Sequence, residues 1–506
     1  MSNSTSAPAP LRIELADERA TLRLAEDIAM VLRPGDAVAL QGDLGAGKTT
    51  LSRALLRALA DDPALEVPSP TFTLVQPYDF KRFPVAHLDL YRMEDPDEID
   101  ELGLDEMLGE GAALIEWPER AEGALPADSL WMTLEATDAG EARVATFYVN
   151  EGDWAERLSR SFALRRFLDE AGWQGASRRF LQGDASARRY ETARVGERHA
   201  IAMNAPARPD GPPVRDGKPY SRIARLAEDV RPFVAIDKAL RERGFAAPEI
   251  YAADCGAGFL LIEDLGRGAV VADGAPIGER YQAAAALLAD LHACDWPREV
   301  TLEDGCVHHV PAYDRDALMI EAELYLDWYV PDVTGAPASA EAAAAFRDGW
   351  NRLIDLMDGS PRTWCLRDYH SPNLIWREER TGNDRLGLID FQDTVIGPEA
   401  YDLASLAQDA RVTVPEALEE ALVASYVALR EERDASFDAE GLRRDYAILS
   451  AHRATKIIGI FTRLARRDGK PGYLAHMPRL FAYLERSLSH PALADIKLWY
   501  DRFAPK

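Results

Sequence analysis

A phosphate-binding loop motif near the N-terminus limits the fold of this chain more than any other feature. Residues 42–49 read GDLGAGKT and match GxxxxGK followed by Ser or Thr, in which glycines let backbone amides converge on phosphate oxygens at a helix N-terminus. An apolar run, residues 38–40, precedes the motif, and a helical stretch, residues 50–60, follows it. Because a plain glycine-rich turn does not need these flanks, the sequence predicts an α/β domain of the P-loop NTPase type.

The motif assigns ATP chemistry to its own residues and to two later carboxylates. Lys48 supplies a charge for the β- and γ-phosphates, and Thr49 offers a hydroxyl to Mg²⁺. Asp89 follows one apolar run and Glu116 another. We predict Asp89 as a second metal ligand and Glu116 as the group that orients or deprotonates water, although a solvated strand-end glutamate would have the same pattern. The residues predicted to contact the nucleotide are Gly42, Asp43, Gly45, Ala46, Gly47, Lys48, Thr49 and Thr50.

A second catalytic pattern lies in the C-terminal half of the chain. Residues 366–373, LRDYHSPN, place Asp368 and Asn373 five positions apart, and a strand-like run ends at Asp390. This is the order of a kinase catalytic loop and its metal-binding aspartate. We predict that Asp368 accepts the proton of a substrate hydroxyl, and that Asn373 and Asp390 hold the Mg²⁺ that bridges the ATP phosphates.

Residues upstream of this loop indicate an ATP site less specifically. The segment 182–190, QGDASARRY, favours a phosphate-covering hairpin, in which Gly183, Ser186 and Arg188 contact the nucleotide. The apolar residues 260–262 run into Glu263, which favours an inter-lobe hinge whose backbone reads adenine. An ordinary strand end would have the same sequence, so the hinge stays one of two interpretations.

The chain divides into two catalytic units. Its 506 residues exceed the roughly 250–300 that one hydrophobic core supports. Short apolar runs alternate with helical stretches in the first part, whereas strand-rich and then helical patterns follow it. We therefore expect a disordered tail at residues 1–9 and an α/β P-loop ATPase domain at residues 10–157. An α+β protein-kinase-like domain is expected at residues 158–506, with a small lobe at about 175–265 and a large lobe at about 270–500.

Composition restricts the compartment and the partners. No apolar run approaches the roughly 20 residues that span a bilayer, so we expect a cytoplasmic protein without membrane contact. The four cysteines have no CxxC spacing, which favours reduced thiols over a metal or disulfide framework. Residues 1–150 carry 28 acidic and 12 basic side chains, so about −16 of the formal charge of −27 lies there. Such a surface repels phosphate backbones, which argues against strong direct nucleic-acid binding and favours a basic protein partner.

Four motifs in the N-terminal part resemble the TsaE family, and the similarity covers essentially residues 10–157. The motifs are GDLGAGKTT at 42–50, PSPTFTLV at 68–75, HLDLYR at 87–92 and IEWPER at 115–120. The resemblance implies an ATPase that works with two partner proteins in making threonylcarbamoyladenosine at position 37 of tRNA. It also implies that Trp117 lies beside the nucleotide and that Thr71 and Thr73 belong to a switch-like segment. The alternative is a nucleotide sensor that regulates the second unit.

Five motifs of the C-terminal part carry a second resemblance. They are GDASARRY at 183–190, RPFVAIDKAL at 231–240, RDYHSPN at 367–373, IDFQDTVIGPEAYDLASL at 389–406 and KIIGIFTRLARRDGKP at 456–471, the last of which lies outside the general kinase pattern. With these motifs, residues of about 160–490 resemble the aminoglycoside phosphotransferase superfamily, and particularly AmgK-like kinases. The resemblance implies ATP-dependent phosphorylation of the anomeric hydroxyl of N-acetylmuramate and N-acetylglucosamine in cell-wall recycling.

Two departures from the kinase pattern keep other functions open. Leu366 stands where a histidine usually precedes the catalytic Arg-Asp, and Met203 and Asn204 stand where kinases carry a phosphate-binding lysine. Substitutes for that lysine are Arg188, Arg189 or Lys218. The alternatives are a kinase for another hydroxyl, such as an aminoglycoside, a choline-like amino alcohol or a protein side chain, and a pseudokinase scaffold that regulates the ATPase.

Overall fold

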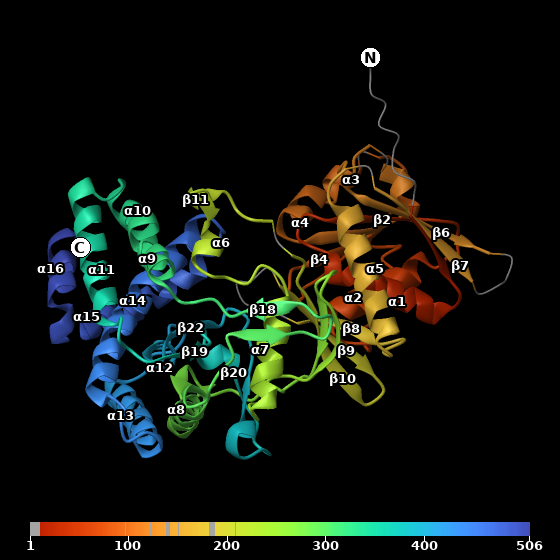
Figure 1. Ribbon diagram of the computed structural model, residues 1–506. Helices are drawn as coiled ribbons and strands as arrows, with labels where there is room; N and C mark the ends of the chain where they lie inside the picture. Colours follow the sequence, from red (N-terminus) through yellow and green to blue (C-terminus); the bar gives the residue numbers. More distant parts are fainter. Residues whose placement is uncertain are drawn as a thin grey trace. The chain divides into compact units, whose positions relative to one another are not determined.

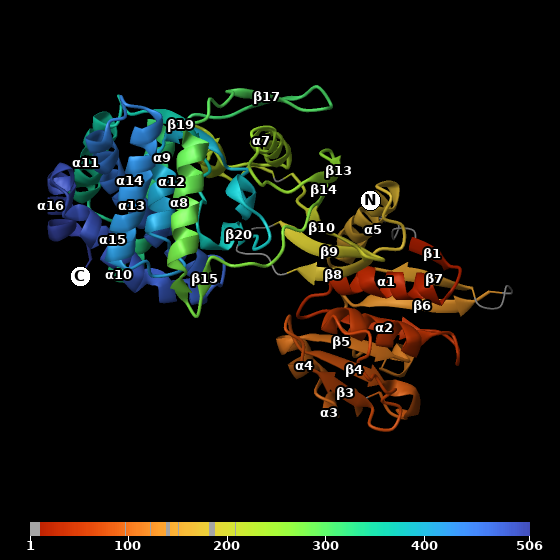
Figure 2. The ribbon, with the colours of Figure 1, turned by 90° about the horizontal axis from the view of Figure 1, so that it is seen from below.

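The computed structural model consists of two compact units, each described by itself (Figures 1 and 2). One unit joins Met1–Ala205 to Tyr251–Glu263, and the other joins Pro206–Ile250 to Asp264–Lys506. The structure describes residues 11–96, 98–121, 123–137, 142–149, 151–181, 188–207 and 209–505.

A seven-stranded sheet forms the N-terminal part of the first unit. Its strand order is β1-β7-β6-β2-β5-β4-β3, and β2 pairs in parallel with both β5 and β6. The central strands are buried because helices cover both faces, as in parallel sheets generally. The apolar runs of the sequence form these strands, so the predicted α/β fold is confirmed. The strands are β1 Leu11–Leu15, β2 Ala37–Gln41, β3 Val75–Tyr78, β4 Val85–Asp89, β5 Ala112–Glu116, β6 Leu130–Ala136 and β7 Arg143–Tyr148.

Helices pack on the two faces of this sheet (Figure 2). On one face, α1 (Glu18–Val31) and α2 (Lys48–Ala60) bury apolar side chains against β2, β5 and β6. On the other, α4 (Leu104–Glu110) and the short α3 (Glu98–Glu101) pack against β4 and β5. Asp17 caps α1 by accepting a hydrogen bond of 2.8 Å from the backbone N–H of Ala20.

One helix, α5 (Trp154–Glu170), belongs to two hydrophobic cores. Trp154 and Leu158 pack into the core of the large sheet, whereas Leu164 and Leu168 pack against a second sheet of strand order β13-β14-β10-β9-β8. The domain boundary predicted between residues 157 and 158 therefore falls inside a continuous helix. The second sheet consists of β8 Ser177–Leu181, β9 Arg189–Val195, β10 Arg198–Asn204, β13 Ile250–Asp254 and β14 Phe259–Ile262.

Buried ion pairs join α1 to α5 and the second sheet. Asp27 on α1 is 4% exposed, and its Oδ1 accepts hydrogen bonds from Arg165 Nη2 at 2.7 Å and Arg178 Nη1 at 2.5 Å. Arg178 on β8 is 1% exposed and also donates from Nε to Glu191 Oε2 on β9 at 2.6 Å. The P-loop part and this sheet thus share helix α5 and a buried charge network.

The second unit is mainly helical, as the pattern after residue 278 predicts. Two antiparallel ladders, β19–β22 and β20–β21, flank the predicted catalytic loop. The strand-rich stretch 175–265 also contains α6 and α7, and a π-helix, Tyr325–Tyr329, follows α9. The helices are α6 Tyr220–Ile223, α7 Arg231–Glu242, α8 Gly278–His292, α9 Arg315–Ala322, α10 Val330–Thr334, α11 Ala340–Leu356, α12 Ala400–Ala407, α13 Glu416–Arg433, α14 Ala439–Arg466, α15 Met477–Leu488 and α16 Ala494–Phe503.

Within the described ranges, no helix of either unit combines the length and the hydropathy that a membrane span needs.

The strands of the second unit are short. The strands are β11 Pro213–Arg215, β12 Lys218–Pro219, β15 Val271–Ala272, β16 Ala275–Pro276, β17 Glu299–Thr301, β18 Val307–His309, β19 Arg362–Cys365, β20 Leu374–Trp376, β21 Leu386–Leu388 and β22 Val395–Pro398.

Candidate nucleotide sites

The P-loop connects the end of β2 to the start of α2, as the motif requires. Gly47 is the N-cap of α2 with φ 107°, a conformation that disfavours any side chain. A Cβ on Gly42 would lie 2.4 Å from the Leu134 carbonyl oxygen, so this position also requires glycine. The amides of the first turn of α2 have no partner within the helix, and they form an anion-binding terminus.

Lys48 folds back over the loop instead of pointing to solvent. Its Nζ donates hydrogen bonds to the carbonyl oxygens of Gly42 at 2.5 Å and Asp43 at 3.1 Å, and it lies 3.6 Å from the ring centroid of Trp117. Burial lowers the pKa of Lys48, and the nearby Glu116 opposes that shift. A buried cation thus sits at the mouth of the loop, where phosphate oxygens can replace the carbonyl partners.

The ends of two neighbouring parallel strands bring the predicted carboxylates together. Asp89 on β4 is the register partner of Glu116 on β5. Glu116 is 1% exposed, and its Oε2 accepts a hydrogen bond of 2.7 Å from Thr49 Oγ1. Its Oε1 lies 2.9 Å from His87 Nε2. Thr49, Asp89 and Glu116 therefore share one edge of the sheet, as the sequence predicts.

The segment before β3 reaches the same edge. Asp89 Oδ2 accepts hydrogen bonds from Ser69 Oγ at 2.8 Å and Thr71 Oγ1 at 2.6 Å. Thr73, which the resemblance places in the same switch-like segment, is exposed. Leu74 next to it has φ 62°. The segment thus touches the cluster through Ser69 and Thr71.

Sequence reasoning missed His87 and Ser69. Both lie inside motifs that carry the TsaE resemblance, but neither follows from the P-loop pattern. His87 and Asp89 are two positions apart on β4, so their side chains lie on the same face of the strand. His87 is completely buried and is the hydrogen-bond partner of a predicted catalytic group. This alternation was the available signal for His87.

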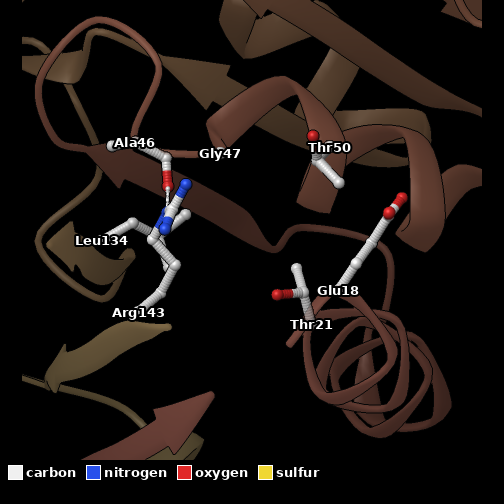
Figure 3. Close-up of a pocket in the computed structure, with 7 residues that line it drawn as sticks. All are labelled: Glu18, Thr21, Ala46, Gly47, Thr50, Leu134 and Arg143. Carbon is white, nitrogen blue, oxygen red and sulfur yellow. Dashed lines mark hydrogen bonds between the residues drawn. The ribbon is translucent and has the colours of Figure 1, made fainter. Parts of the chain in front are cut away.

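A pocket of about 300 Å³ adjoins the P-loop (Figure 3). Arg143 of β7 turns toward the loop and donates from Nε to the Ala46 carbonyl oxygen at 3.1 Å, while Glu18 and Thr21 approach from α1. The pocket lies beside the phosphate-binding loop, where the sugar or base of a nucleotide could fit. The lining residues are Glu18, Thr21, Ala46, Gly47, Thr50, Leu134 and Arg143.

The oxygen donors at this site fit Mg²⁺ bound together with a nucleotide. Mg²⁺ takes one or two protein oxygens and completes its shell with phosphates and water. The Thr49 hydroxyl and the Asp89 carboxylate supply such oxygens. Throughout the described part of the chain, no group of three or more His, Cys, Asp or Glu side chains has the arrangement of an independent metal centre.

The kinase-like loop is held in a strained conformation. Arg367 and Asp390 are non-glycine residues with φ of 69° and 61°. Asp402 on α12 accepts hydrogen bonds from the backbone N–H groups of Leu366 at 2.6 Å and Arg367 at 2.8 Å. Such conformations persist only where neighbouring groups stabilise them, and the Asp402 carboxylate is such a group for Arg367.

Hydrogen bonds join the loop that carries Asp368 and Asn373 to the segment that carries Asp390. Asn373 Nδ2 donates to the Asp368 carbonyl oxygen at 2.9 Å, and the N–H of Ile389, next to Asp390, donates to the Asn373 carbonyl oxygen at 3.2 Å. Gln392 Nε2 donates to Asp390 Oδ1 at 3.0 Å. The Asn373 amide and the Asp390 carboxylate again supply oxygens that suit Mg²⁺.

Charges around Asp368 keep it ionised. Burial by itself raises the pKa of Asp368, but His370, Lys456 and Arg453 outweigh that effect and lower the pKa below its usual range. A carboxylate in this state can accept a proton at neutral pH.

The predicted upstream residues are placed less completely. Gly183 and Ser186 lie outside the described residues, Arg188 immediately precedes β9, and Glu263 immediately follows β14. Met203 and Asn204, at the position of the missing lysine, are buried on β10. Asn204 Oδ1 accepts a hydrogen bond of 2.9 Å from Arg160 Nε of α5.

The two other proposed substitutes for the lysine lie at the start of a strand of the second sheet and on a two-residue strand. Arg189 opens β9, and burial together with the charges of Arg33 and Arg157 lowers its pKa. Lys218 is an exposed residue of β12.

Comparisons with known proteins assign both parts of the chain. Residues 15–144 match the family model of the threonylcarbamoyl adenosine biosynthesis protein TsaE, and residues 177–436 match that of the phosphotransferase enzyme family. An N-acetylmuramate/N-acetylglucosamine kinase of Caulobacter vibrioides is 37% identical over 358 residues, which are 68% of this chain and 97% of that kinase.

This chain belongs to the TsaE family and to the phosphotransferase enzyme family. A TsaE protein of Rickettsia conorii is 41% identical over 145 residues, 29% of this chain and 82% of that protein. A kinase of the same name as the Caulobacter protein, from Pseudomonas aeruginosa, is 33% identical over 322 residues, 62% of this chain and 84% of that kinase. The chain is thus a fusion of a TsaE domain with a phosphotransferase-family kinase domain, and both resemblances are confirmed.

Proposed function

We propose that this chain is bifunctional. The TsaE domain hydrolyses ATP in the biosynthesis of N6-threonylcarbamoyladenosine at position 37 of tRNA, and the kinase domain transfers the γ-phosphoryl group of ATP to the anomeric hydroxyl of N-acetylmuramate or N-acetylglucosamine. One observation supports this proposal best: the chain has two separate catalytic clusters, one with Thr49 and Glu116 and the other with Asp368 and Asn373. The first lies in a domain whose relatives are named as TsaE proteins, and the second in a domain whose relatives are named as N-acetylmuramate/N-acetylglucosamine kinases. We propose the cytoplasm as the place of both activities.

In the TsaE domain, the P-loop amides and Lys48 bind the phosphates, and Thr49 and Asp89 hold Mg²⁺, which neutralises phosphate charge when bound. His87 contacts Oε1 of Glu116 and Thr49 donates to Oε2, so Oε2 would be the oxygen that accepts a proton from the attacking water. Trp117 lies against Lys48 and closes one side of the site.

Features of the surface support partner-dependent action of the TsaE domain. Leu44 in the P-loop and Phe72 in the switch-like segment are 82% and 81% exposed, which is unusual for large apolar side chains beside a catalytic site. We propose that these side chains contact the other proteins of the threonylcarbamoyl-tRNA complex. The acidic surface makes strong direct binding of tRNA by this domain unfavourable.

In the kinase domain, Asp368 accepts the hydroxyl proton of the sugar as the sugar oxygen attacks the γ-phosphorus. The bond between this phosphorus and the β–γ bridging oxygen breaks, and ADP leaves. Asn373 and Asp390 hold Mg²⁺, and Gln392 orients the Asp390 carboxylate. The replacement of the usual lysine by Met203 and Asn204 favours, as second candidate, a pseudokinase that acts as a scaffold.

The test is mass-detected phosphorylation across amino sugars, aminoglycosides and choline, with wild type, Asp368→Asn and Lys48→Ala. We expect phosphorylated N-acetylmuramate or N-acetylglucosamine, lost with Asp368→Asn and retained with Lys48→Ala, because the base belongs to the kinase domain alone. Phosphorylation of another acceptor would replace the sugar in this proposal. No phosphorylated acceptor despite ATP binding would favour the scaffold.

A further inference from the structure

Residues 456–471 are a motif of the sequence that the proposed reaction does not use. They extend from the last turns of α14 into the following segment, and lie beyond residues 177–436 of the family match. Helix α14 packs alongside α9 and the residues after it, with contacts at successive turns of both helices. These contacts are His452 Nε2 to the Leu318 carbonyl oxygen at 2.8 Å, Lys456 Nζ to Glu321 Oε1 at 2.8 Å, and Gly459 against the Leu324 backbone.

Glu321 is the centre of this contact. It is 0% exposed, and its Oε1 accepts hydrogen bonds from Arg367 and Lys456 while its Oε2 accepts one from Tyr313. Burial by itself raises the pKa of Glu321, but Lys456 and Arg367 outweigh it and bring the pKa to about 2. The ionised carboxylate therefore ties the side chain of Arg367 to α9 and α14.

A second chain of contacts leads from Lys456 to the backbone of Arg367. Lys456 Nζ donates to the Tyr401 hydroxyl at 3.1 Å, and Arg453 Nη1 donates to the same hydroxyl at 3.2 Å. Arg453 Nη1 also donates to the Arg367 carbonyl oxygen at 3.1 Å. Two chains of contacts thus connect Lys456 to Arg367. One leads through Glu321 to the Arg367 side chain, and the other leads through Tyr401 and Arg453 to the Arg367 carbonyl oxygen.

Arg367 needs such support. Its left-handed backbone is unfavourable for a residue with a side chain, and it directly precedes Asp368, whose N–H donates to the Leu366 carbonyl oxygen at 2.8 Å. Leu366 is 3% exposed and cannot hydrogen-bond through its side chain as the histidine usual at this position can. Groups outside the loop must therefore hold its conformation.

We propose that Lys456 is a positioning residue of the kinase, which acts through Glu321 and Arg453 to hold Arg367 and thereby the Asp368 carboxylate. This inference rests on the proposed kinase function of the same site. The Lys456→Met substitution removes one of the three cationic side chains of this network and leaves Arg367 and Arg453 in place. Since misplacement of a catalytic group by about 1 Å can cost roughly 100-fold in rate, we expect kcat to fall by about 10- to 100-fold, with KM for ATP changed by less than about threefold.

The experiment compares Lys456→Met, Glu321→Gln and their double variant with a matched control, Lys497→Met. Lys497 forms an exposed i,i+4 pair with Asp501 on α16 and touches no part of the cluster. All variants carry Lys48→Ala, so that nucleotide binding reports on the kinase site. The measurements are kcat and KM, the stoichiometry of a non-hydrolysable ATP analogue, and hydrogen exchange of residues 366–373.

The expected result is a lower kcat at unchanged binding stoichiometry, with faster exchange of residues 366–373 in Lys456→Met but not in Lys497→Met. The double variant should be little worse than either single variant, because both act through one network. Unchanged kcat and exchange in Lys456→Met would overturn the proposal, as would a kcat that falls only in proportion to binding stoichiometry. If the wild type phosphorylates no acceptor, the proposed function fails, and hydrogen exchange still decides whether Lys456 holds the loop.

Discussion

Non-glycine residues with left-handed backbone conformations occur at both catalytic clusters. Trp117 and Leu74 border the TsaE site with φ of 60° and 62°. Arg367 lies in the kinase-like loop 366–373, and Asp390 follows β21. Such conformations cost energy and persist where hydrogen bonds from neighbouring elements stabilise them. At the residue scale, hydrogen bonds hold these backbones in place: the Trp117 N–H donates to the Leu40 carbonyl oxygen at 3.3 Å, and the Arg367 N–H donates to Asp402 Oδ1 at 2.8 Å.

The His87–Glu116 contact provides a residue-scale prediction. Replacing His87 with Leu removes the hydrogen bond to Glu116 Oε1, so we expect partner-stimulated ATP hydrolysis to fall by about 10- to 100-fold while ATP binding persists. His87→Gln can place an amide near the former Nε2 and should lose less. The measurement is steady-state hydrolysis together with nucleotide-binding titration. Equal activity of His87→Leu and wild type would show that Glu116 needs no such partner.

At the scale of elements, close helix packing explains a glycine inside α14. A Cβ on Gly459 would come within 2.4 Å of the carbonyl carbon and oxygen of Leu324. Glycine lowers helix propensity by about 1 kcal/mol relative to alanine, so its presence in the middle of a long helix indicates that close approach matters more here. Gly459 lies about one helical turn after Lys456. The close packing at Gly459 therefore places the Lys456 amine beside the Glu321 carboxylate.

Gly459→Ala should therefore destabilise the protein although alanine is the better helix former. We expect a net loss of roughly 1–3 kcal/mol from overpacking, seen as a lower midpoint of urea unfolding, and a reduced kinase kcat. Gly472→Ala is the matched control, because a Cβ there meets nothing within 4 Å. A Gly459→Ala variant as stable as the control would mean that the two helices can separate at no cost.

At the scale of the whole molecule, the fusion is more than a covalent linkage. Helix α5 packs into the cores of both the P-loop sheet and the second sheet, and Asp27 joins them through Arg165 and Arg178. Residues from both family matches consequently form one compact unit. Cutting the chain at the predicted boundary would divide a helix and expose both cores.

Asp27→Asn should destabilise this unit. Breaking a buried pair typically costs about 3–5 kcal/mol, and we expect the lower end of this range because Arg178 keeps Glu191 and Arg165 keeps Glu26 as acidic partners. We expect a lower thermal midpoint for the unit that joins Met1–Ala205 to Tyr251–Glu263, and the measurement is hydrogen exchange of β8 and α1 as the temperature is raised. Asp61→Asn is the control, since Asp61 pairs with Arg179 at 3.1 Å but is 60% exposed and should contribute at most about 1 kcal/mol. Equal midpoints for the two variants would contradict a structural role of the buried network.

The sequence by itself determined the features that depend on residues close together in the chain. The P-loop, the predicted strands of the α/β sheet and the spacing from Asp368 to Asn373 are local, because glycines, apolar periodicity and short loops act over a few residues. The nucleotide and metal contacts predicted from the sequence stay predictions at both sites, those of the P-loop as well as those of Gly183, Ser186, Arg188 and Glu263. Only the tertiary structure decided which distant groups meet. Glu116 with His87, Lys456 with Glu321, and the shared helix α5 depend on packing between elements, and side-chain identity alone does not specify these contacts.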